Sequence, residues 1–148
     1  MEVQPDFKEL LGLFNVHGVD YLIVGGYALA FHGAPRFTVG LDVLVQPEPD
    51  KARKILAALA DFGFGDLGLC PGDFIRPETV VQLGVPPVRI VLLNSLTGVP
   101  WEEAWAGKTA GLYGNLPVGY LGREQLIANK RTLGRKRDLA DLEALGEE

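Results

Sequence analysis

The chain has 148 residues, 47% of them hydrophobic and 22% charged, which is enough to bury the core of one globular domain, predicted over 1–148. Its formal net charge of -5 argues against general DNA binding, because a nucleic-acid coat needs a basic face. No apolar run approaches the roughly 20 residues that cross a bilayer, and the single cysteine, Cys70, fits a reducing compartment, so we expect a cytoplasmic protein.

The first part of the chain predicts helices alternating with two buried strands. Apolar residues at helical spacing follow Asp6, and a helix-starting proline follows the second apolar run. The expected elements, in chain order, are a helix over 6–17, a strand over 21–24, a short helix over 26–31, a strand over 41–46 and a helix from Pro47 to about Phe62.

The second part predicts one hairpin, a further pair of short strands and two closing helices. Residues 62–77 are rich in glycine and proline and are expected to form a loop with one short edge strand. Beyond it we expect strands over 79–83, 88–93, 109–113 and 116–120, a helical turn over 100–105, and helices over 123–133 and 135–145 separated at Gly134. Strands and helices do not alternate strictly, which favours an α+β fold, a mixed sheet with helices on one face.

Two glycines follow the first predicted strand, and a carboxylate lies on the next one. Gly25 and Gly26 let the backbone approach a phosphate, and the helix that follows offers free N–H groups to an anion. Asp42 can hold a metal ion against that phosphate. A buried, unpaired acid would be costly, so Asp42 should have a partner or face a cleft. The pattern predicts a nucleotide site; a tight turn and a polar strand residue are the alternative interpretation.

Residues along nearly the whole chain, except the loop around 64–77, resemble one known group of proteins. The matching segments are Val24-Gly25-Gly26, Ala28, His32-Gly33, Arg36, Thr38, Leu41-Asp42, 87–93, 101–105, 126–131, Gly134-Arg135 and 138–141. This ordered set resembles the minimal nucleotidyltransferase superfamily. More narrowly, it resembles small bacterial proteins related to abortive-infection nucleotidyltransferase toxins.

The resemblance implies a mixed β-sheet with flanking helices, the nucleotidyltransferase (polymerase-beta-like) fold. It also implies magnesium-dependent transfer of a nucleoside monophosphate from a nucleoside triphosphate (NTP) to a hydroxyl. In that family the glycine pair sits at the triphosphate, two acids separated by one residue bind the metals, and a third acid activates the acceptor. Carried over to this chain, the nucleotide-binding residues would be Gly25, Gly26, Arg36, Thr38 and Lys130, and the metal-binding catalytic residue would be Asp42.

Two of the three acids expected from the resemblance are missing. Side chains at i and i+2 of a strand share a face, which is why paired acids can hold two metal ions. The paired positions here are Gly40 and Asp42, and the third falls at Val91. We therefore predict weak or absent transfer and a residual nucleotide-binding module. The alternatives are an active enzyme with Asp73 or Glu78 as a replacement acid, and a non-catalytic protein-interaction module of the toxin–antitoxin type.

Several other residues admit both a functional and a structural interpretation. Arg36 and Thr38 can contact phosphate, or Arg36 can be a solvated loop charge. His32 is expected to satisfy a backbone carbonyl, and Cys70 to be a small buried apolar group. Trp101 and Trp105 are expected to cover the core.

One basic cluster lies near the end of the chain. Its members are Lys130, Arg131, Arg135, Lys136 and Arg137. They can contact a triphosphate or RNA, or they can form a helix surface paired with Asp138 and Asp141. The protein or tRNA acceptor is left open by the sequence.

Overall fold

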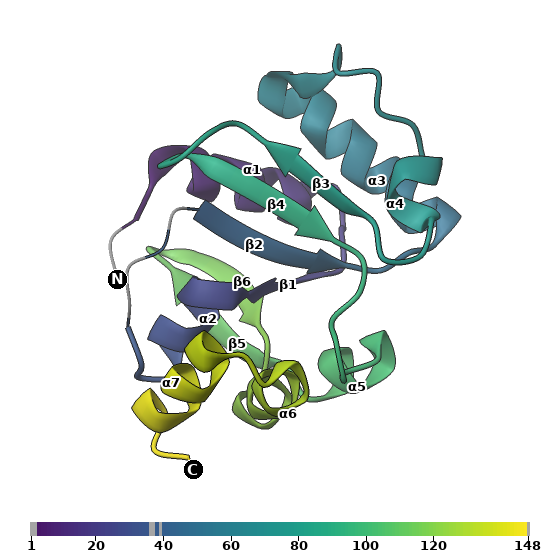
Figure 1. Cartoon of the computed structure of the whole chain (residues 1–148). Helices are drawn as coiled ribbons and strands as arrows, with labels where there is room; N and C mark the ends of the chain where they lie inside the picture. Colours follow the sequence, from purple (N-terminus) through teal and green to yellow (C-terminus); the bar gives the residue numbers. More distant parts are fainter. Residues whose placement is uncertain (1–2, 36–37, 39, 148) are drawn as a thin grey trace.

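The computed structural model, which describes residues 3–35, 38 and 40–147, contains a six-stranded mixed sheet in the order β3-β4-β2-β1-β6-β5 (Figure 1). The β3–β4, β5–β6 and β1–β2 pairs are antiparallel, whereas β2–β4 and β1–β6 are parallel. The strands are β1 (Tyr21–Val24), β2 (Gly40–Val45), β3 (Val80–Leu83), β4 (Arg89–Leu93), β5 (Thr109–Tyr113) and β6 (Leu116–Tyr120). The predicted hairpin of β3 and β4 is confirmed, and so are the predicted short strands β5 and β6, which also pair as a hairpin.

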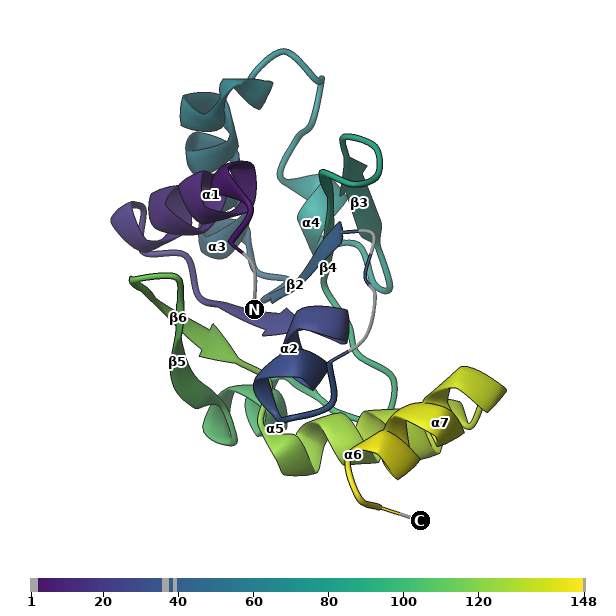
Figure 2. The ribbon, with the colours of Figure 1, turned by 90° about the vertical axis from the view of Figure 1, so that its left-hand side faces the viewer.

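Helices cover both faces of this sheet, so the prediction of helices on one face was wrong (Figure 2). The helices are α1 (Pro5–Val16), α2 (Gly25–Phe31), α3 (Pro49–Leu59), α4 (Gly72–Ile75), α5 (Trp101–Ala106), α6 (Arg123–Leu133) and α7 (Lys136–Ala144), with a π-helical turn η1 (Ala60–Phe64) after α3. In the described part of the chain, none of these helices has the length and apolar character needed to span a bilayer.

The two faces are explained by the alternation of side chains along β2. Leu41 and Val43 point into a core shared with α1 and α3, whose buried members include Phe14 and Ile55. Leu44 points the other way, into a second core with residues of α5, α6 and α7. A strand that is apolar on both sides needs cover on both sides, and each face therefore has its own helices.

The region 62–77 differs from its prediction. It contains the end of η1 and the four-residue helix α4, and the described residues there form no edge strand. Phe74 of α4 is fully buried and anchors this segment to the core beneath α3. Cys70, predicted to be buried, is exposed, so it contributes no apolar packing.

Candidate functional site

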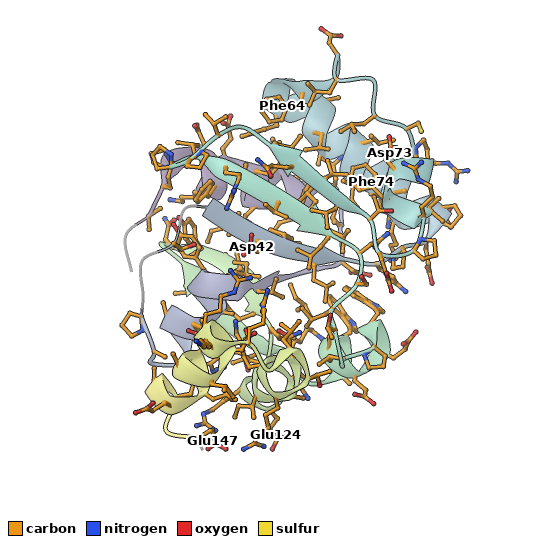
Figure 3. All side chains as sticks on the ribbon, viewed as in Figure 1. Asp42, Phe64, Asp73, Phe74, Glu124 and Glu147 are labelled. Atoms are coloured by element: carbon orange, nitrogen blue, oxygen red, sulfur yellow. The ribbon has the colours of Figure 1, made fainter. Side chains whose placement is uncertain are left out.

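The sheet register brings the three predicted acid positions together. Asp42 of β2 is paired directly with Val91 of β4, and Gly40 is paired with Arg89. Gly40 and Asp42 lie two residues apart on one face, as expected for a strand. A single carboxylate therefore stands where the resemblance implies three. Figure 3 shows Asp42 on the central strand β2.

The glycine turn at the end of β1 lies against this carboxylate. Val24 of β1 pairs with Asp42, and Gly25 follows with a left-handed φ of 66°. A β-carbon at Gly25 would collide with Asp42 Oδ2, so the carboxylate packs directly over the Gly25 backbone. A β-carbon at Gly26 would lie 2.8 Å from Thr38 Cβ, which places Thr38 against the same turn.

Replacing Gly25 by alanine is expected to displace the Asp42 carboxylate. The positive φ disfavours any β-carbon, and the added methyl group occupies the position of Oδ2. We expect a loss of about 1–2 kcal/mol in the free energy of unfolding, measured by urea denaturation. Gly33→Ala is the matched control, because Gly33 also has a positive φ but its β-carbon would have no atom within 4 Å. Equal losses in the two variants would contradict this account.

Thr38 is held by its own backbone neighbourhood. Its hydroxyl donates a hydrogen bond to the Gly40 carbonyl oxygen at 2.9 Å, which fixes the entry of the chain into β2. The Thr38 side chain is half-buried at the rim of the site. Arg36, the neighbouring predicted phosphate contact, lies outside the described residues.

A cleft of about 660 Å³ opens between this face of the sheet and the junction of α6 and α7. The predicted site residues Gly25, Gly26, Thr38, Asp42 and Lys130 all line it, so the structure brings these five together. The further described lining residues are Val24, Gly40, Val80, Arg89, Val91, Leu93, Leu96, Asn129, Leu133, Arg135 and Arg137.

Lys130, which the resemblance implies is a nucleotide-binding residue, is buried and faces two carboxylates. Its Nζ lies 3.4 Å from Asp138 Oδ1 and 3.0 Å from Asp141 Oδ2. Asp138 is completely buried and also accepts hydrogen bonds from the Arg135 backbone N–H at 3.1 Å and from Arg135 Nε at 2.6 Å. These contacts cap α7 and join it to α6. The charge of Lys130 is thus balanced within the protein.

Hydrogen bonds from Arg135 lower the pKa of Asp138 to about 2, against the opposing effect of burial. The same ion pair raises the pKa of Arg135 above its ordinary value. Asp138 is therefore a carboxylate at neutral pH. The predicted pairing of Arg135 with Asp138 is confirmed, and Asp141 pairs with Lys130.

Two other arginines that line the cleft have no carboxylate partner among the described residues. Within the described residues, Arg89 and Arg137 form no salt bridge and no side-chain hydrogen bond, and Arg89 Nε is buried without a partner. Arg89 was not singled out from the sequence. The signal was present, since Arg89 and Val91 are two residues apart on one strand and must share a face.

The residues of the cleft do not fit a pair of magnesium ions. Magnesium takes carboxylate and phosphate oxygens, and two ions need several carboxylates between them. Across the described residues, no group of three acids, histidines or cysteines comes together. The suggested replacements lie elsewhere. Asp73 is on α4 (Figure 3), where it accepts hydrogen bonds from Cys70 N and Arg76. Glu78 is exposed and is not among the residues that line the cleft.

Two structural interpretations from the sequence are confirmed. The His32 ring nitrogen Nε2 lies 2.7 Å from the Leu121 carbonyl oxygen, which is a backbone contact. Trp101 and Trp105 stack with their centroids 5.3 Å apart and pack against the core beneath α5 and α6. Neither set lines the cleft that contains Asp42.

Comparison with known proteins supports the fold. No model of a protein family matches the chain, and no curated protein matches it either. A crystal structure of a "putative nucleotidyltransferase" from Thermotoga maritima superimposes with a TM-score of 0.60 at 12% sequence identity, covering 96% of this chain and 93% of that one. The fold is therefore a nucleotidyltransferase-like α+β fold, as the resemblance implies.

Proposed function

We propose that this chain is a nucleotidyltransferase-fold protein that binds an NTP in the Asp42 cleft and has lost most or all of its transfer activity. The observation that carries the proposal is the register of β2 and β4. It puts Val91 beside Asp42 and Gly40 on the same face, so the place for a carboxylate trio holds one carboxylate. The glycine turn and the basic wall of the cleft are present around it.

The absence of two carboxylates is expected to lower the rate of transfer strongly. Removing one preorganised electrostatic group costs on the order of 10²–10³ in rate, and removing a general base costs roughly 10²–10⁴. The two losses need not multiply. Each loss alone is expected to slow ordinary nucleotidyl transfer by at least about a hundredfold, whereas binding of the phosphates depends on other residues of the cleft.

Binding without transfer is the expected result. Isothermal titration with ATP and with CTP should show binding in at least one buffer, with or without magnesium. Incubation of the protein with α-labelled NTPs, magnesium, and total tRNA or protein should give no more labelled product than the Asp42→Ala variant. Strong labelling that disappears in Asp42→Ala would contradict the loss of activity. No binding in any buffer would contradict the nucleotide site itself.

The narrower relationship belongs to the same proposal. The ordered C-terminal motif, from Leu126 to Asp141, supports a place beside the abortive-infection nucleotidyltransferase toxins. Under this proposal, the chain with its one carboxylate is expected to act by binding a nucleotide or a partner. The total tRNA and protein used as acceptors in the assay test both acceptor classes together.

A further inference from the structure

The cleft has an excess of positive charge although the protein is acidic. Its described lining carries four cationic side chains and one carboxylate, whereas the whole chain has a net charge of -5. Lys130 and Arg135 form ion pairs with Asp141 and Asp138, and these two acids are not among the described residues that line the cleft. Arg89 and Arg137 therefore outweigh Asp42, which leaves an excess of positive charge facing the cleft.

Arg89 occupies the position next to the missing first acid. It is paired with Gly40, and its backbone comes so close that a β-carbon at Gly40 would collide with the Arg89 carbonyl oxygen. The Arg89 side chain points to the face that carries Val91 and lines the cleft. Its Nε is buried without a hydrogen-bond partner within the described residues. A buried guanidinium nitrogen in this state is stabilised by an anionic ligand.

Arg137 approaches the cleft from the opposite wall. It lies on the first turn of α7, it is exposed, and it has no side-chain partner in the described part of the chain. An arginine on each wall gives two sets of donors suited to phosphate oxygens. Together they supply the positive charge that a divalent cation would otherwise bring to a triphosphate.

We infer that the cleft binds the phosphate chain of its nucleotide directly through Arg89 and Arg137, without a divalent metal ion. This inference rests on the proposed nucleotide site and concerns which groups neutralise the negative charge of the triphosphate. A metal-free triphosphate carries about two more negative charges than its magnesium complex. A cleft with excess positive charge prefers the more anionic form, whereas a site built from carboxylates prefers the magnesium complex.

The sign of the magnesium effect tests the inference. ATP titrated in EDTA is expected to bind about threefold to tenfold more tightly than ATP with excess magnesium, at equal ionic strength. Arg89→Gln and Arg137→Gln are each expected to weaken binding in EDTA by about tenfold or more, because each removes a charge-assisted hydrogen bond. Inorganic tripolyphosphate should show the same losses, since the contacts are to phosphate.

Control variants separate this inference from the nucleotide site. Arg53→Gln changes an exposed arginine on α3 that pairs with Asp50, and it should leave affinity unchanged. Val91→Asp adds a carboxylate beside Asp42 and should reverse the magnesium effect, so that the metal strengthens binding. Thermal melts confirm that each variant is folded.

The outcomes are distinct. ATP that binds only with magnesium, with no loss in Arg89→Gln, overturns the metal-free mode and leaves the proposed nucleotide site standing. Losses for ATP but not for tripolyphosphate place the arginines at the nucleoside and also overturn it. The absence of binding in both buffers overturns the proposed function and this inference together.

Discussion

Replacing Gly40 by aspartate is expected to destabilise the protein and not to restore a metal ligand. A β-carbon at this position would meet the Arg89 carbonyl oxygen, with the Arg89 carbonyl carbon at 3.0 Å and Cβ at 3.1 Å. These are atoms of a paired strand, which cannot move without disturbing the β2–β4 ladder. Overpacking of this kind costs about 1–3 kcal/mol, and the added carboxylate is repelled by Asp42. We expect a total loss of about 3 kcal/mol.

Urea denaturation of three variants separates the causes of this loss. Gly40→Ala adds only the β-carbon and should retain most of the destabilisation. Gly12→Ala is the matched control, because a β-carbon there has no atom within 4 Å and Gly12 lies inside helix α1. Alanine at Gly12 should stabilise the protein by about 0.5–1 kcal/mol. If Gly40→Ala were as stable as the unmodified chain, the close approach of β2 and β4 would be refuted.

Removal of Asp138 is expected to cost the protein about 3–5 kcal/mol of unfolding free energy. Its carboxylate is fully buried, pairs with Lys130 and Arg135, and caps α7. Asp138→Ala leaves the buried Lys130 ammonium with only Asp141 and removes the cap. Asp50→Ala is the control, because Asp50 is 85% exposed and its pair with Arg53 contributes little. Similar losses in the two variants would show that the buried network is not a stabilising unit.

The same carboxylate predicts a pH dependence. The pKa of Asp138 is about 2 in the folded protein, below its ordinary value of 3.8 in the unfolded chain. Its contribution is therefore complete above about pH 5 and is lost as the pH falls towards 2. The difference in unfolding free energy between the unmodified protein and Asp138→Asn should stay constant from pH 7 to about pH 5 and then shrink. A difference that grows on acidification would contradict the lowered pKa.

Most of the fold was predictable because its signals are local. The hairpin over 79–93 formed as expected, and the segments 109–113 and 116–120 are short strands around a Gly-Asn turn, as predicted. The helices on both faces of the sheet were not predicted. The sequence of β2 nevertheless indicates them, because its apolar residues fall on both faces of the strand. Helix α4 has only four residues, too few for any helical period to appear in the sequence.

The candidate site was predictable only in part. The placement of Asp42 and Val91 followed from strand periodicity and the resemblance, and the register agrees with it. The pairing of Lys130 with Asp141 joins two helices across the turn at Gly134, and no sequence spacing encodes that contact. Arg89 was not among the predicted site residues, although its place two residues before Val91 puts it on the same face of the strand. The roles of these residues in binding stay predictions.

The position of β1 in the sheet has a consequence for how the protein is made. β1 precedes the other described strands in the chain, yet it lies between β2 and β6, and Ile23 pairs with Tyr120, which is made much later. All four residues of β1 are buried in the finished fold. During synthesis, the edge of β1 that later pairs with β6 therefore keeps unpaired N–H and C=O groups beside apolar side chains until β6 has been made. Loss of the β5–β6 hairpin would leave β1 as an exposed edge strand that can pair with another chain and aggregate.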